Sequence, residues 1–173
     1  VSGEVHLETN GTQVTLEQAF VTYDLGNGLA VTAGRYLSLL GFEADETVTR
    51  YTRSRAYDLT SLIPLYNEGV KLEAVSDKGW LAVSLQNEVW SGFGPGNING
   101  DAIGLEVQAG FTGQQGLTAV IGYAGQDTEG SANPNGEIYN IWVSYESGPL
   151  ILAAEYNDFA NAGEKDKTGD SVM

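Results

Sequence analysis

The chain has 173 residues, of which 23 are acidic and 8 basic, and its formal net charge is -15. Such a charge repels phosphate backbones, which excludes nucleic acid as a partner. A hydrophobic content of 42% excludes a wholly disordered chain, and the absence of cysteine excludes disulfides and thiolate metal sites. No run of about 18 apolar residues occurs, so the sequence contains no transmembrane helix.

Apolar side chains alternate with small or polar ones along most of the chain, which is typical of β-strands with one apolar face. Between Asp101 and Phe111, for example, the odd positions are mainly apolar and the even positions are small or polar. In chain order, such strands are predicted near 4–8, 18–23, 29–34, 70–74, 81–86, 103–111, 117–124, 138–145 and 150–157. These roughly nine strands, of about 8 to 11 residues each, are near the length needed to cross a bilayer at a tilt.

Short turns and long connections alternate along the chain. Tight turns rich in glycine are predicted at 26–28, 77–79, 112–116 and 147–149, and longer connections at 37–68, 91–100, 126–135 and from 159 onward. Short turns on one rim and long loops on the other are the layout of an outer-membrane barrel. The sequence therefore predicts an all-β, antiparallel up-and-down transmembrane β-barrel. Because the chain starts inside a strand and ends in a polar loop, residues 1–173 are interpreted as part of one larger barrel domain.

Aromatic residues fall at the ends of several apolar faces, where a tyrosine ring can be buried in lipid while its hydroxyl stays in the headgroup zone. The predicted lipid-facing aromatic rim consists of Tyr23, Phe111, Tyr123, Tyr139, Tyr145 and Tyr156. The opposite face carries charged residues that would line a water-filled lumen and favour cations. These predicted lumen residues are Lys71, Glu73, Glu88, Glu106 and Glu155, although an exposed face needing charge for solubility would carry the same residues.

The stretch from Leu16 to Trp90 resembles the β-barrel porin family of Gram-negative outer membranes. The resemblance is carried by Leu16 to Tyr23, Gly34-Arg35-Tyr36, Leu40-Gly41-Phe42-Glu43, Tyr51 to Tyr57 with its Arg-Ser-Arg core, and Asn67-Glu68-Gly69-Val70-Lys71. It implies a barrel of roughly 14 to 18 strands with a water-filled lumen, of which this chain supplies a part. It further implies an outer-membrane location, contact with membrane lipid and lipopolysaccharide, passive diffusion of small polar solutes or ions, and a homo-oligomer, with many porins being trimers.

The connection 37–68 is too long to be an idle loop in a compact domain. It combines apolar residues with an acidic cluster and a basic cluster, namely Glu43, Asp45 and Glu46 and then Arg50, Arg53 and Arg55. An apolar side would allow the loop to fold inward against the barrel wall, and the two clusters would then create a transverse field across the opening. This is the hypothesis of a pore constriction. A loop packed on the rim with solvated charges is the alternative.

No catalytic site, metal site or cofactor is predicted. His6 is the single histidine, and no serine or carboxylate can be assigned to it from the sequence. The leading interpretation is a diffusion pore rather than an enzyme. Two alternatives remain: a soluble or surface β-sandwich that binds carbohydrate through Trp80, Trp90 and Trp142, and a barrel that is structural and does not conduct.

Overall fold

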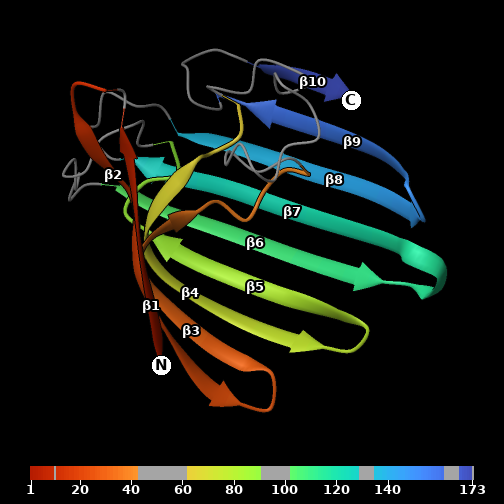
Figure 1. The fold of residues 1–173 in the computed structure, drawn as a ribbon. Helices are drawn as coiled ribbons and strands as arrows, with labels where there is room; N and C mark the ends of the chain where they lie inside the picture. The colour runs from red at the N-terminus through yellow and green to blue at the C-terminus, as the bar shows by residue number, and fades with distance from the viewer. Residues whose placement is uncertain (10, 43–61, 91–101, 129–134, 162–167, 173) are drawn as a thin grey trace.

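The computed structural model describes residues 1–9, 11–42, 62–90, 102–128, 135–161 and 168–172. Their strands form one antiparallel sheet in which each strand pairs with the next along the chain, as Figure 1 shows. The strands are β1 (Ser2–Thr9), β2 (Val14–Gly26), β3 (Leu29–Leu37), β4 (Tyr66–Ser76), β5 (Gly79–Gln86), β6 (Ala102–Thr112), β7 (Leu117–Thr128), β8 (Gly136–Ser147), β9 (Leu150–Ala160) and β10 (Thr168–Val172). The predicted fold class, an up-and-down antiparallel sheet that forms part of a barrel, is confirmed. The sheet is open between β1 and β10.

The two faces of the sheet differ as the alternation predicts. Ile121 and Ile141 are Cα partners in β7 and β8, and their side chains are 57% and 47% exposed on the outer, convex face. The next pair in the register, Gly122 and Asn140, is buried on the inner, concave face. The described strands all belong to this one sheet, so the β-sandwich alternative, which requires two packed sheets, is wrong.

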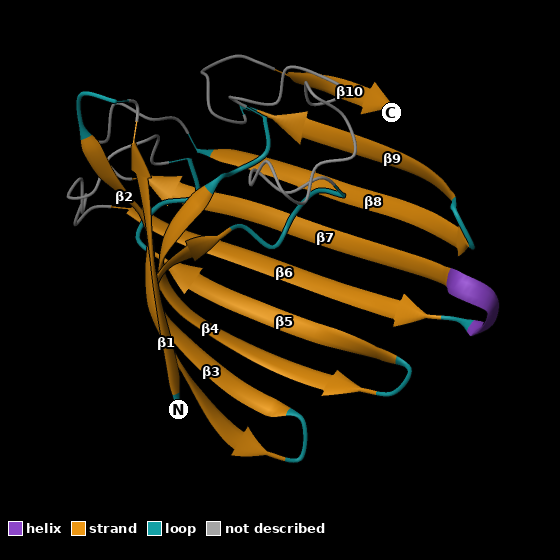
Figure 2. Ribbon diagram, in the orientation of Figure 1, coloured by secondary structure: helices purple, strands orange, loops and turns teal. Residues whose placement is uncertain are grey.

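The short turns lie along one edge of the sheet, between β2 and β3, β4 and β5, β6 and β7, and β8 and β9 (Figure 2). The first turn follows from its sequence, because Gly26, Asn27 and Gly28 all have positive φ angles, of 84°, 54° and 79°. A Cβ atom on Gly28 would lie 2.1 Å from the carbonyl oxygen of Val75 in β4, so only glycine fits there. The turn between β6 and β7 contains the 3-10 helix η2 (Gln114–Gly116).

The structure has one strand more than the sequence predicts. β10 occupies part of the segment that was predicted to be a polar loop, and that part of the prediction was wrong. Its sequence, TGDSV, has no alternation of large apolar residues that would reveal a strand. The segment is a strand because it pairs with β9, with Gly169 opposite Phe159 and Ser171 opposite Asn157. Among the described residues, no helix is long and apolar enough to span a membrane.

Candidate functional site

The inner face of the sheet carries many polar side chains, and most of them are buried although the sheet is a single layer. The residues with exposed fractions of 8% or less include Thr32, Asn67, Ser84, Gln86, Glu106, Gln126, Asn140, Ser144, Glu155 and Asn157. Buried polar groups in proteins need hydrogen-bond partners. Parts of the chain itself therefore have to cover this face, and two of the covering segments come from the long connection between β3 and β4.

The first covering segment is Ser38–Phe42, called here the inner segment, which follows β3 and crosses the concave face (Figure 1). Glu106 in β6 binds its beginning. One carboxylate oxygen of Glu106 accepts a hydrogen bond from Ser38 Oγ at 2.8 Å, and the other accepts one from the backbone N–H of Leu39 at 2.9 Å. Asn67 Nδ2 also donates to Glu106, at 2.7 Å, and Gln108 Nε2 donates to the carbonyl oxygen of Leu39.

The end of the inner segment is held two to three strands further along the sheet. The N–H of Gly41 donates to Asn140 Oδ1 in β8 at 3.4 Å, and the N–H of Phe42 donates to Glu155 Oε2 in β9 at 3.2 Å. Asn140 Nδ2 donates in turn to Glu155 Oε1 at 2.5 Å. The ring of Phe42 packs edge-on against Trp142, with ring centroids 5.3 Å apart. The segment thus spans four strands, from β6 to β9, and both of its ends are bound by a carboxylate of the wall.

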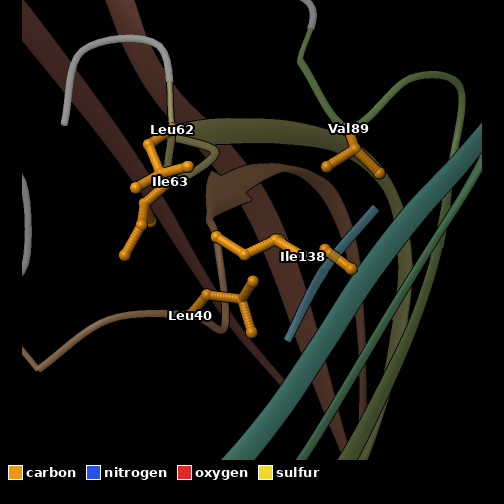
Figure 3. Packing of buried hydrophobic residues seen from close by; sticks show 6 residues of the cluster. Leu40, Leu62, Ile63, Val89 and Ile138 are labelled. Atoms are coloured by element: carbon orange, nitrogen blue, oxygen red, sulfur yellow. The ribbon is translucent and has the colours of Figure 1, made fainter. Parts of the chain in front are cut away.

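Apolar contacts complete the attachment at the edge of the sheet where the long connections lie. Leu40, Leu62, Ile63, Val89, Ala124 and Ile138 form a buried cluster with Trp90 and Phe159 against it (Figure 3). A Cβ atom on Gly122 would lie 2.4 Å from Leu40 Cδ2, so the missing side chain in β7 makes the space that Leu40 occupies. Both ends of the connection between β3 and β4 therefore pack against the same inner wall.

The end of this connection is also fixed by hydrogen bonds. Trp90 Nε1 donates to the carbonyl oxygen of Leu62 at 2.9 Å. Gln126 Oε1 accepts the backbone N–H groups of Val89 and Trp90 at 3.0 and 3.1 Å. These bonds tie the described residues after β5 to β7 and to the second covering segment, Leu62–Leu65.

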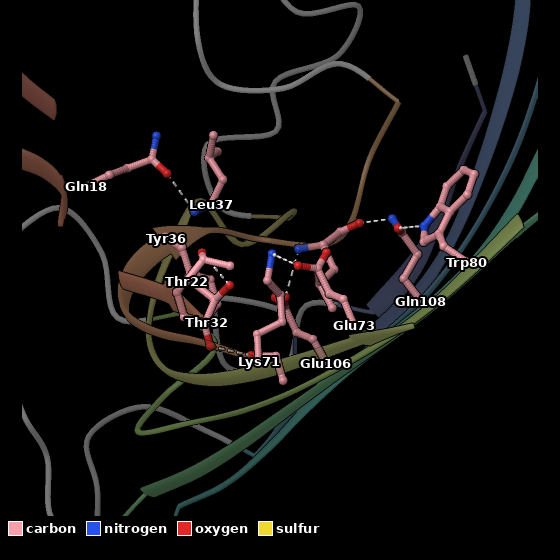
Figure 4. Close-up of polar contacts among 12 residues, drawn as sticks. Gln18, Thr22, Thr32, Tyr36, Leu37, Lys71, Glu73, Trp80, Glu106 and Gln108 are labelled. Atoms are coloured by element: carbon pink, nitrogen blue, oxygen red, sulfur yellow. Dashed lines mark hydrogen bonds and ion pairs between the residues drawn. The ribbon is translucent and has the colours of Figure 1, made fainter. Parts of the chain in front are cut away.

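Two basic residues near the inner segment are already paired with carboxylates. Lys71 Nζ lies 3.0 Å from Glu73 Oε2 and 5.5 Å from the ring centroid of Tyr36, whose hydroxyl is hydrogen-bonded to Ser84 at 2.8 Å (Figure 4). Arg35 Nη1 lies 3.0 Å from Glu68 Oε1. The carboxyl groups of Glu106 and Glu155 instead accept hydrogen bonds from neutral donors.

The structure places the predicted lumen residues on or beside the inner face, with different exposure. Glu88, Glu106 and Glu155 are buried, at 3%, 0% and 3% exposed. Lys71 and Glu73 are partly exposed. The six charged residues of the predicted constriction, Glu43, Asp45, Glu46, Arg50, Arg53 and Arg55, lie outside the described residues.

The predicted aromatic rim lies on the outer face, but its members are at different heights. Tyr23, Phe111 and Tyr145 lie near the short turns. Tyr123 and Tyr139 are Cα partners whose ring centroids are 5.1 Å apart, and Tyr156 pairs with Ile141 near the middle of β8 and β9. Five of the six side chains are 38% or more exposed, and Tyr123 is partly buried.

Sequence reasoning missed the residues that bind the inner segment. Ser38, Asn67, Gln108 and Asn140 are neutral and polar, as are many residues of this chain, and nothing in their local sequence distinguishes them. The alternation does place Gln108 and Asn140 on the inner face. Only their partners, 69 and 99 residues away in the chain, give them a role.

A comparison with protein families agrees with the fold of one up-and-down antiparallel sheet. The family described as "Putative beta-barrel porin-2, OmpL-like" matches residues 2–172. The chain belongs to this porin family. No curated protein and no solved structure matches the chain. Membership in this family indicates a porin-like role and a membrane-embedded β-barrel.

Proposed function

We propose that the chain forms part of an outer-membrane pore through which small polar solutes or ions diffuse passively. One observation carries the proposal: a single sheet leaves large apolar side chains uncovered on its convex face and gathers polar side chains on its concave face. Ile121, Ile141 and Leu152 are all 47% or more exposed. Such a face is stable in contact with lipid, and the concave face is suited to water. The outer surface would contact membrane lipid and lipopolysaccharide, and the barrel would assemble as a homo-oligomer such as a trimer.

The inner segment supports the proposal of a constriction formed by the connection between β3 and β4. Its last residue, Phe42, is bound to Glu155 in β9, which directs the chain across the concave face before residue 43. The residues that follow include the acidic and basic clusters at 43–46 and 50–55. We propose that these clusters face the water-filled path and that Lys71 and Glu73 line it, so that their charges set the preference between cations and anions.

A barrel that is structural and does not conduct is the second candidate, because the inner segment and the cluster around Leu40 and Ile138 cover part of the concave face. Liposome swelling separates the two. Vesicles containing the folded full-length protein are expected to swell in isotonic solutions of small sugars, at rates that fall as the solute grows. Protein-free vesicles are the control. Swelling no faster than in the control, with the protein shown to be folded in the bilayer, would favour the structural barrel.

Replacing Arg50, Arg53 and Arg55 together with alanine is expected to shift ion selectivity toward cations. The substitution removes three positive charges from a chain whose net charge is already -15. The reversal potential of the full-length pore in a salt gradient measures the shift. Lys78→Ala, in the short turn between β4 and β5, is the control for removing a positive charge at a distance from the proposed constriction. An unchanged reversal potential in the triple variant would count against the constriction.

A further inference from the structure

A second group of apolar residues lies on the inner face, nearer the short turns than the cluster around Leu40 and Ile138. Trp80, Gly110, Val120 and Trp142 are successive Cα partners across β5, β6, β7 and β8. These four residues are called here the tryptophan strip. The row lies one step nearer the short turns than Gln108, Gly122 and Asn140, which contact the inner segment or make room for it. The strip therefore lies beside the inner segment on the same wall.

The indole ring of Trp80 is held in one position at one end of the strip. Its Nε1 donates to Gln108 Oε1 at 2.7 Å, and Gln108 is itself bound to Leu39 of the inner segment (Figure 4). A Cβ atom on Gly110 would lie 2.2 to 2.4 Å from three ring atoms of Trp80, so the ring covers the glycine backbone of β6. The side chain remains partly exposed on the inner face. An aromatic ring fixed in this way loses little conformational entropy when a ligand stacks on it.

The other end of the strip has an unsatisfied hydrogen-bond donor. The ring of Trp142 is packed edge-on by Phe42, but its buried Nε1 has no hydrogen-bond partner among the residues that the structure describes. Between the two tryptophans, Val120 is 3% exposed. Buried donors in proteins are rarely left unpaired, and an exception needs an explanation. A bound molecule with hydroxyl oxygens would provide the missing acceptor after a small movement of the ring.

The charges near the strip favour a neutral ligand. A cation would also stack on an aromatic ring, but it needs carboxylates that are available to it. Here Glu106 and Glu155 accept hydrogen bonds from the inner segment, and Glu73 is paired with Lys71. An anion would find Lys71, a basic residue of the same face, already paired with Glu73. Sugars are neutral, carry hydroxyl groups and have apolar C–H faces that match tryptophan rings.

We propose that the tryptophan strip is a stacking subsite for sugar rings, and that neutral oligosaccharides are among the solutes of the pore. The inference rests on the proposed pore function. It assigns Trp80 as the main stacking surface and the Nε1 of Trp142 as a donor to a sugar oxygen.

Maltotriose is the probe for the first test, which uses single-channel recordings of the full-length protein in planar bilayers. We expect maltotriose to reduce the current in a saturable way. Trp80→Leu keeps the apolar bulk but removes the aromatic face, and it is expected to raise the half-blocking concentration about tenfold. Trp80→Phe keeps an aromatic face and is expected to stay within about threefold of the unmodified protein. Phe111→Leu is the matched control, because it removes an aromatic face on the outer side of the neighbouring strand β6, and it should not change the half-blocking concentration.

A second measurement separates failure of this inference from failure of the pore proposal. Quenching of tryptophan fluorescence by maltotriose in the detergent-solubilised full-length protein reports binding without requiring conduction. In one outcome, the protein conducts ions while maltotriose neither blocks the current nor quenches the fluorescence. That result would overturn the sugar subsite and leave the pore proposal intact. Saturable quenching that Trp80→Leu weakens would support the subsite even in a barrel that does not conduct. Stronger block by choline than by maltotriose would overturn it in favour of a cation site.

Discussion

Glu106→Ala is expected to detach the beginning of the inner segment from the wall and to increase the single-channel conductance of the full-length pore. Glu106 is fully buried and accepts hydrogen bonds from Ser38 Oγ, the N–H of Leu39 and Asn67 Nδ2. Alanine provides no acceptor for these three donors. Each buried donor left unpaired costs about 1–3 kcal/mol, which favours movement of the segment away from the wall.

Two measurements check this result. Conductance in planar bilayers reports the opening, and urea unfolding in detergent reports the expected fall in stability. Glu106→Gln retains one acceptor oxygen and should give a smaller change in both. Glu73→Gln is the matched control, because Glu73 pairs with Lys71 on the inner face. If Glu106→Ala conducts like the unmodified protein, the inner segment does not limit the opening.

Ile121→Arg is expected to weaken folding into a bilayer much more than Thr118→Arg. Both residues lie in β7, but Ile121 is exposed on the convex face, whereas Thr118 pairs with Thr112 and Ser144 on the concave face. An arginine on the lipid face near the midplane of a barrel costs about 2–4 kcal/mol, because the charge leaves water. An arginine on the concave face can remain hydrated, so the substitution at Thr118 should cost less.

The fraction of full-length protein folded into phospholipid vesicles, measured against urea concentration, tests this difference. The two variants introduce the same side chain into the same strand, so a general effect of arginine on β-propensity cancels. Equal destabilisation by the two substitutions would contradict a lipid-facing convex surface and, with it, the proposed pore.

Alternation predicted the faces of the sheet well because it is a local property of extended backbone. Successive side chains of a strand point to opposite faces, so the sequence alone placed Ile121 and Ile141 on one face and Asn140 and Glu155 on the other. Turn chemistry has the same local origin, as the three positive φ angles at residues 26–28 show. β10 was missed because its strand conformation depends on pairing with β9 and not on its own residues.

The sequence by itself determined which side chains belong to each face, where the tight turns lie and that one sheet winds up and down. Only the tertiary structure decided what covers the concave face. Glu106 and Glu155 were predicted as charges facing water, yet they are buried beneath the inner segment and bind its N–H groups. A two-residue period specifies on which side a carboxylate lies. The period does not specify which distant segment will donate hydrogen bonds to that carboxylate. The choice of segment depends on the curvature of the sheet and on space such as the gap at Gly122.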